Sequence, residues 1–191
     1  MDLTTALLTR ASVGALSEPA PEGAALAQLL EAGAAAPDHG RLRPWRFILV
    51  RGAARERLGA VFAAALARSV PEATAPMLER ERAKPLRAPL ILVVAAHVVE
   101  HPKVPAIEQV LAAGAAAQNI LLAAHAAGFG AMWRTGEPAY DEGVKAALGL
   151  APGDAIVGFL YLGTRRDAAA ERPRKAPEAL EWNGPGSLTP V

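Results

Sequence analysis

Basic, hydroxyl and aromatic side chains gather in a few short stretches of an otherwise aliphatic chain. Arg10-Ala11-Ser12 is the first, and a guanidinium fork beside a hydroxyl can donate several hydrogen bonds to phosphate oxygens. Residues 36–47, APDHGRLRPWRF, place an acid, a histidine, three arginines and a tryptophan before an apolar run. When each stretch is taken alone, a solvated helix end is the simpler explanation for the first and a surface turn for the second.

Two further stretches have the same character. Residues 128–136, GFGAMWRTG, offer two glycines and then an aromatic ring, a cation and a hydroxyl. Glycine lets the backbone approach a flat ligand, and Trp133 could pack on an aromatic ring. Residues 161–166, YLGTRR, end an apolar run with a hydroxyl and two arginines, which suits an anion. The alternatives here are a helix end followed by a core tryptophan, and a solvated strand end.

Together the four stretches predict cations for a phosphate and a glycine-hinged loop for a planar ring, without an acid–base pair for hydrolysis. This combination favours flavin mononucleotide over a substrate that needs general acid–base chemistry, and we name no catalytic side chain. Neither a G-x-G-x-x-G fingerprint after a strand nor a P-loop is present. His97 and His101 follow a strand without a third ligand nearby, so a metal site is disfavoured.

Apolar periodicity indicates the elements that must position these stretches. Strands are expected over 46–50, 90–96 and 155–163, and helices over 2–9, 22–35, 53–67, 72–84, 105–127 and 141–148. The run LILVVAA at 90–96 has no polar alternation, so helices should cover both of its faces. Residues 109–133 carry no charge, but their polar residues and glycines favour a buried helix over a membrane span. The pattern predicts a layered α/β domain, and the tail from residue 164 is expected to lie in solvent or along a partner subunit.

The overall composition limits the classes of function. The chain has 191 residues, which suits one domain or one domain with an added arm. Twenty basic and 19 acidic residues give a net charge of +1, so neither a nucleic-acid nor a membrane partner is predicted. Cysteine is absent, which excludes disulfides and thiolate ligands. The N-terminus does not resemble a signal peptide, and we expect a cytoplasmic protein.

Several of these motifs, in order along the chain, resemble the nitroreductase superfamily, most closely its YdjA-like branch of minimal NAD(P)H nitroreductases. They are Arg10-x-Ser12, APDH at 36–39, PWRF at 44–47, RAPLILVV at 87–94, HPKVP at 101–105, GFGAMWRTG at 128–136 and GFLYLGT at 158–164. The resemblance implies an α+β, three-layer α/β/α fold, with a mixed, mostly antiparallel sheet and a long central helix near a dimer interface. It divides the chain into an FMN-binding domain, 1–164, and a C-terminal arm, 165–191, packed on the partner subunit.

The resemblance also implies an activity. A homodimer would hold FMN at its interface and take hydride from NADH or NADPH in a ping-pong reaction. A small oxidant such as a nitroaromatic or a quinone would then be reduced.

Carried over by position, the resemblance implies a set of FMN-binding residues. Arg10, Ala11 and Ser12 would hold the phosphate and ribityl end. His39 would reach the flavin from the other subunit. The isoalloxazine ring would be lined by Ala131, Met132 and Trp133. Two arginines, Arg134 and Arg165, are added to this set as further contacts.

Some positions depart from the family pattern. Ala11 stands where many relatives have a second arginine, and Ala35 where some have a basic residue. Arg41 or Arg43 would then supply the missing cation, and without one FMN affinity would be low.

Two other functions remain open. One is a flavin-binding or flavin-remodelling protein of the same fold without reductase turnover. The other is a non-enzymatic helical ligand-sensing or interaction module, against which the uninterrupted strands argue.

Overall fold

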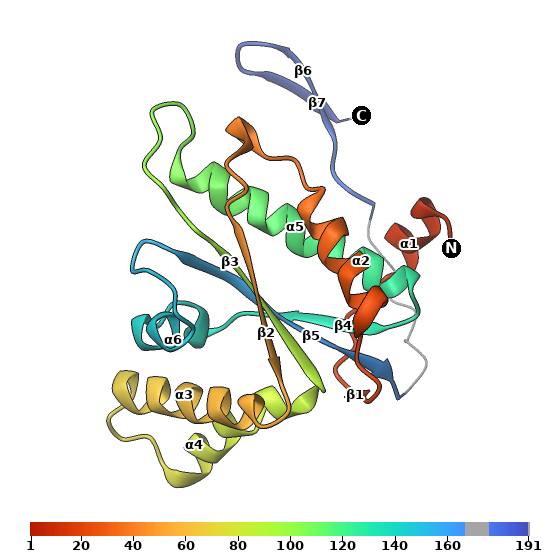
Figure 1. Cartoon of the computed structure of the whole chain (residues 1–191). Helices are drawn as coiled ribbons and strands as arrows, with labels where there is room; N and C mark the ends of the chain where they lie inside the picture. Colours follow the sequence, from red (N-terminus) through yellow and green to blue (C-terminus); the bar gives the residue numbers. More distant parts are fainter. Residues whose placement is uncertain (167–175, 191) are drawn as a thin grey trace.

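A five-stranded antiparallel sheet forms the centre of the molecule, and helices cover both of its faces (Figure 1). The computed structural model describes residues 1–166 and 176–190. The strands are β1 (Leu16–Ser17), β2 (Trp45–Arg51), β3 (Leu90–Ala96), β4 (Gly130–Arg134) and β5 (Ala155–Arg165). Their order is β1-β5-β3-β2, and β4 also pairs with β5. Every pairing between described strands is antiparallel, in agreement with the mostly antiparallel sheet that the family resemblance implied.

The helices follow the predicted pattern closely. They are α1 (Leu3–Thr9), α2 (Gly23–Ala34), α3 (Ala54–Ser69), α4 (Ala75–Arg82), α5 (Ala106–Ala126) and α6 (Glu142–Ala147), with 3-10 helices η1 (His39–Arg41), η2 (Lys84–Arg87) and η3 (Glu137–Ala139). The helix predicted over 72–84 is shorter than expected. It begins after Thr74, and beyond Arg82 the chain tightens into η2, where Pro85 cannot donate an α-helical hydrogen bond.

Two apolar clusters lie on opposite faces of the sheet. On one face Ile91 and Val93 of β3 pack with Phe62 of α3. On the other face Leu92 and Val94 pack with residues of α2 and α5, such as Ile120. Because successive side chains of a strand alternate between faces, β3 is buried at every position, which explains its lack of polar alternation. The predicted three-layer α/β/α arrangement is confirmed, and the all-helical module is wrong.

The apolar stretch at 109–133 is divided between α5 and β4. Helix α5 is long enough and apolar enough to cross a membrane, judged by length and composition alone. One of its faces is nevertheless packed into the core, with Ala113, Ala117 and Ile120 fully buried against α2 and the sheet. The preference for a buried helix is therefore confirmed for this face, while Ile107 and Leu111 point outward and are about 60% exposed (62% and 63%).

One expectation about an irregular segment was wrong. Residues 130–134, predicted as a loop, form β4, because Gly130 and its partner Gly163 allow close pairing along β5. The tail contains a hairpin, β6 (Leu180–Gly184) with β7 (Ser187–Pro190), which stands apart from the main sheet in Figure 1. Strand β5 continues through Arg165, so the predicted boundary after residue 164 falls one residue before the end of this strand.

Candidate functional site

The first candidate stretch lies beside the edge strand β4. Asp2 caps α1 by accepting a hydrogen bond from the Thr5 amide at 3.0 Å, and the helix ends with Arg10 as its C-cap residue. Just beyond, the Val13 amide donates to the Ala131 carbonyl at 2.9 Å. The residue that follows 10–12 is thereby bonded to β4, so the structure brings near each other two stretches that are about 120 positions apart in the chain.

Strand alternation divides the second candidate stretch between two faces. Ala131 and Trp133 pack with the cluster on the α5 side, while Met132 packs with the cluster on the α3 side. Arg134 also faces the α3 side, with its guanidinium 5.5 Å from the ring centre of Tyr161. Burial raises the pKa of that phenol to about 12, so the ring stays neutral. A loop could have directed all four side chains toward one ligand. In the strand, the side chain of Arg134 points to the opposite face from those of Ala131 and Trp133.

Trp133 is held in place by the neighbouring strand. Its indole N–H donates to the Val157 carbonyl at 3.1 Å. The next residue, Gly158, leaves the space that the indole occupies, because a Cβ there would overlap the indole nitrogen. The aromatic ring is therefore fixed at the sheet edge, half buried.

Arg165, at the end of β5, joins this group through His125, a buried residue in the last turn of α5. An Nη2–H of Arg165 donates to Nδ1 of His125 at 3.3 Å, and Nε2 of His125 lies 2.9 Å from Oγ1 of Thr9. Burial, Arg165 and Arg10 all lower the pKa of His125, in that order. The available signal in the sequence was a histidine within the uncharged, mostly apolar stretch 109–133, since a buried polar group needs hydrogen-bond partners.

His39 lies at the other end of α5. Its Nδ1 is 2.5 Å from Oε2 of Glu108, in the first turn of that helix. Seventeen residues separate Glu108 from His125, and at a rise of about 1.5 Å per residue this is about 26 Å. Within one chain, His39 is therefore not part of the group formed by Arg10, Ala131 and Arg165.

Arg41 and Arg43 share the η1 loop with His39, and both have positive φ, 55° and 48°. The loop is closed by the Arg43 amide, which donates to Oδ2 of Asp38 at 2.6 Å. Neither arginine can replace a cation at position 11 within the same chain, because this loop lies beside the first turn of α5.

The histidines considered as metal ligands have structural partners. Nδ1 of His97 lies 2.8 Å from Oδ1 of Asp154, and Nδ1 of His101 accepts from the amides of Lys103 and Val104. Within residues 1–166 and 176–190, no three histidine, aspartate or glutamate side chains are grouped closely enough to hold a metal.

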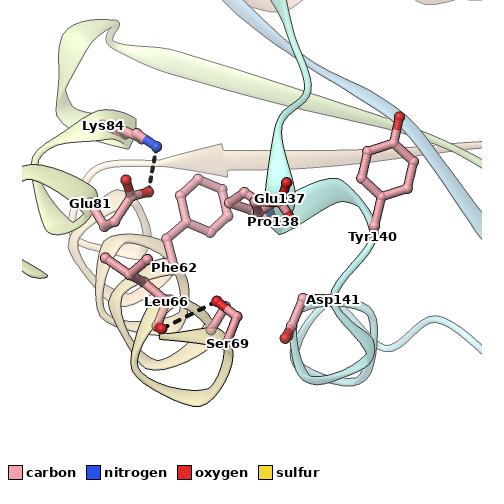
Figure 2. A pocket seen from close by; sticks show the side chains of 10 residues that line it. Phe62, Leu66, Ser69, Glu81, Lys84, Glu137, Pro138, Tyr140 and Asp141 are labelled. Atoms are coloured by element: carbon pink, nitrogen blue, oxygen red, sulfur yellow. Dashed lines mark hydrogen bonds and ion pairs between the residues drawn. The ribbon is translucent and has the colours of Figure 1, made fainter. Parts of the chain in front are cut away.

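A cavity of about 260 Å³ lies elsewhere, between α3, α4 and the segment around η3 (Figure 2). Phe62 and Leu66 form its apolar wall, and the buried carboxylate of Glu81 pairs with Nζ of Lys84 at 2.5 Å. None of the nine predicted FMN-binding residues lines this cavity, which lies on the α3 side of the sheet. The candidate site is instead the region where the end of α1, the edge of β4 and the end of β5 meet, which we call the seam.

Known proteins resemble this chain over most of its length. Residues 7–164 match the family model described as "Nitroreductase family". Over 164 residues the chain is 42% identical to an Escherichia coli K12 protein named "Putative NAD(P)H nitroreductase YdjA", covering 86% of this chain and 88% of that one.

Solved structures share the fold. A nitroreductase-like family protein from Bacillus cereus superposes with a TM-score of 0.78 at 26% identity, covering 92% of each chain. A nitroreductase with bound FMN from Bacteroides fragilis superposes with a TM-score of 0.70 at 20% identity, covering 93% of this chain and 95% of that one. The similarity to the Escherichia coli protein extends over most of the chain, and the family model spans all the motifs that carried the resemblance. The chain belongs to the nitroreductase family.

Proposed function

We propose that this protein is an FMN-dependent NAD(P)H oxidoreductase. One observation carries the proposal: the end of α1, the edge of β4 and the end of β5 meet at one seam. Arg10 and Arg165 lie at one end of this seam, and β4 with the fixed ring of Trp133 lies at the other. The Escherichia coli relative is named for an NAD(P)H nitroreductase, and the Bacteroides fragilis protein holds FMN in the same fold. Both agree with the chemistry of the seam.

The residues at the α1 end fit a phosphate. Arg10 and Arg165 are close enough to the same histidine to lower its pKa, so two guanidinium groups share one small region. Nε of Arg165 is buried without a hydrogen-bond partner, and no described carboxylate forms an ion pair with this arginine. The hydroxyl of Ser12 is at the surface two residues beyond Arg10. These groups would hold the phosphate and ribityl end of FMN by charge-assisted hydrogen bonds.

The edge of β4 fits the planar ring. The Ala131 carbonyl points away from β5, because it accepts from Val13 on the other side. Polar groups alternate in direction along a strand, so the Trp133 amide points the same way and would donate to the edge of the ring. Donors placed there would stabilise negative charge on the reduced cofactor.

When bound, FMN supplies the redox chemistry: it takes hydride from NADH or NADPH and reduces a small oxidant such as a nitroaromatic or a quinone. The protein would bind and orient the ring and keep one face open for the nicotinamide and the oxidant in turn. No side chain has to act as a nucleophile.

We further propose that the site is completed by a second copy of the chain. The outward face of α5 exposes Ile107 and Leu111 beside the small residues Gly114 and Ala115. If two copies pack through this face about a two-fold axis with their α5 helices antiparallel, the first turn of one helix meets the last turn of the other. The partner's copy of the η1 loop, with its histidine and arginines, would then lie beside Arg10.

The C-terminal hairpin fits the role of an arm on that second copy. Trp182 is 69% exposed and pairs with Leu188, which is 58% exposed, so both lie on one face of the hairpin. An isolated two-stranded hairpin is marginally stable in water. Burial of this face on the partner would stabilise it, and residues 165–191 would then be an arm beside a domain formed by 1–164.

Spectroscopy tests the proposed function. The protein is purified with added FMN, freed of excess, and examined for flavin absorbance and quenched flavin fluorescence. NADH or NADPH is then added without oxygen, and the absorbance near the flavin maximum should disappear and return when a quinone or nitroaromatic is added. Colourless protein after saturation with FMN contradicts flavin binding. Retained flavin that neither nicotinamide reduces would instead favour the flavin-binding protein without reductase turnover.

A further inference from the structure

His125 occupies the junction between α1, α5 and the end of β5. It lies in the last turn of α5 and is only 9% exposed. Both ring nitrogens have partners, Thr9 on α1 and Arg165 on β5. These partners belong to the two segments that carry the cations of the proposed phosphate site.

The direction of each hydrogen bond at His125 follows from the donors. Arginine can only donate, so Nδ1 of His125 accepts from Arg165 and must be unprotonated. A neutral ring then carries its proton on Nε2 and donates to Oγ1 of Thr9 at 2.9 Å. The Thr9 hydroxyl in turn donates to the Thr5 carbonyl at 2.7 Å. One continuous chain of bonds therefore runs from the Arg165 guanidinium into the backbone of α1.

The charges around His125 favour this neutral form. Among the described residues, Arg165 of β5 and Arg10 at the end of α1 are the charged groups that act on the ring, and no described carboxylate forms an ion pair or hydrogen bond with it. Burial and these two cations lower the pKa of His125 below 6.5. The ring is therefore an acceptor for Arg165 at neutral pH.

Gly130 of β4 leaves space for the side chain of Arg165. A Cβ at position 130 would lie 2.9 Å from Cγ of Arg165 and closer still to Leu16, so only glycine lets the arginine side chain cross β4 at this point. The glycine, the histidine and the threonine together fix where the guanidinium lies.

We propose that neutral His125 is a positioning residue, which holds Arg165 beside Arg10 so that the two guanidinium groups form a clamp for a terminal phosphate. The inference rests on the proposed function, because FMN is the phosphate-bearing ligand. It also accounts for Ala11, which stands where many relatives have a second arginine. In this chain Arg165, at the end of β5, would supply that second cation.

Comparing the binding of FMN with that of riboflavin tests whether His125 positions a phosphate clamp or only stabilises the fold. Riboflavin has the ring and ribityl chain of FMN but no phosphate. Dissociation constants of both flavins are measured by fluorescence quenching for the wild type and for His125→Leu, His125→Gln and Arg165→Gln. Glutamine keeps one acceptor and one donor and serves as the conservative variant.

His125→Leu is expected to weaken FMN binding about tenfold, the effect of one lost charge-assisted bond, and to leave riboflavin binding unchanged. Most of the FMN affinity should return in His125→Gln. The double variant H125L/R165Q should bind FMN no more weakly than R165Q alone, because His125 acts through Arg165. Equal losses for both flavins, or additive losses in the double variant, would overturn the inference.

A second measurement needs neither flavin nor the leucine variant. With 15N-labelled histidine, the His125 signals, identified from their loss in H125Q, should show a neutral ring protonated on Nε2 at pH 7. An imidazolium or an Nδ1-protonated ring would overturn the inference even if H125L failed to fold. Wild-type protein that binds neither flavin would contradict the proposed function itself, whereas wild-type FMN binding with no effect of His125 would contradict only the clamp.

Discussion

The indole of Trp133 lies against the backbone of Gly158, across the pairing of β4 with β5. The indole N–H bonds to the carbonyl of the residue before this glycine, and a methyl group at position 158 would overlap the indole nitrogen. The glycine therefore decides where the aromatic ring of the edge strand lies.

Gly158→Ala should displace Trp133, because the new Cβ also lies 3.1 Å from the Arg134 carbonyl and cannot move into the strand. We expect a loss of stability of about 1–3 kcal/mol from overpacking, measured by urea unfolding, and an altered tryptophan emission spectrum. Gly153→Ala is the matched control, because a Cβ there has no neighbour within 4 Å. Equal stability of the two variants would show that Trp133 is not fixed by this contact.

Arg10 and Arg134 should differ in their effect on FMN, although the sequence assigned both to the cofactor. Arg10 lies at the α1 end of the seam, whereas Arg134 faces Tyr161 on the α3 side. Arg10→Ala should weaken FMN binding by about 1.5–3 kcal/mol, the range for a hydrogen bond to a charged group, and Arg134→Ala should have little effect. Fluorescence titration at constant ionic strength measures both. A larger loss for Arg134→Ala would place the phosphate on the other face of the sheet.

Leu111→Glu should disrupt the proposed dimer. Leu111 is 63% exposed on α5, and a carboxylate buried between two copies without a partner is strongly unfavourable. Light scattering after size exclusion should give the mass of one chain for this variant and of two chains for the wild type. Leu86→Glu is the control, since Leu86 is 48% exposed in η2, far from the proposed interface. A wild-type mass of one chain would refute the shared site.

The pH dependence of stability should reveal His125 in the flavin-free protein. Because the pKa of His125 in the folded chain lies below its ordinary value of 6.5, the unfolded chain binds the proton first as pH falls. Stability is then complete above about pH 6.5 and is lost as pH falls from there toward the folded-state pKa. Urea unfolding at pH 7.5 and 5.5 should show a smaller loss for His125→Gln than for the wild type. Equal losses in the two proteins would mean that the pKa of His125 is not lowered.

Asp154 should stabilise the turn before β5. Burial raises the pKa of this carboxyl, but hydrogen bonds from the Ala151 amide, at 3.0 Å, and from His97, at 2.8 Å, outweigh burial and leave the pKa below 3.8. The charged form thus contributes stability above about pH 4, which is lost as pH falls through the folded-state pKa. Asp154→Ala should cost about 1–3 kcal/mol at pH 7, and the difference from the wild type should shrink near pH 3.

Urea unfolding at both pH values measures this effect, with Glu142→Ala as the control. Glu142 pairs with Lys145 at the surface, and exposed ion pairs contribute little. A difference between Asp154→Ala and the wild type that stayed constant down to pH 3 would mean that the charge of Asp154 is not responsible.

Much of the fold and of the candidate site could be predicted from the sequence, because helices, buried strands and helix caps depend on local sequence patterns. The unbroken apolar run at 90–96 predicted a strand covered on both faces, and Asp2 predicted the start of α1. The order of the motifs identified the family and predicted that Arg10, Ser12 and Trp133 belong to one site.

Only the tertiary structure decided which of these residues lie together. Residues 130–134 form a strand because they pair with β5, and the alternation of that strand separates Arg134 from Trp133. His125 joins Arg165 to α1 through partners that are 40 and 116 positions away in the chain, beyond the reach of any local pattern. His39, which the family resemblance assigns to the same cofactor, lies at the far end of α5. The sequence by itself determined the elements and the family, and the packing of distant segments decided the faces, partners and ends at which the chemistry can occur.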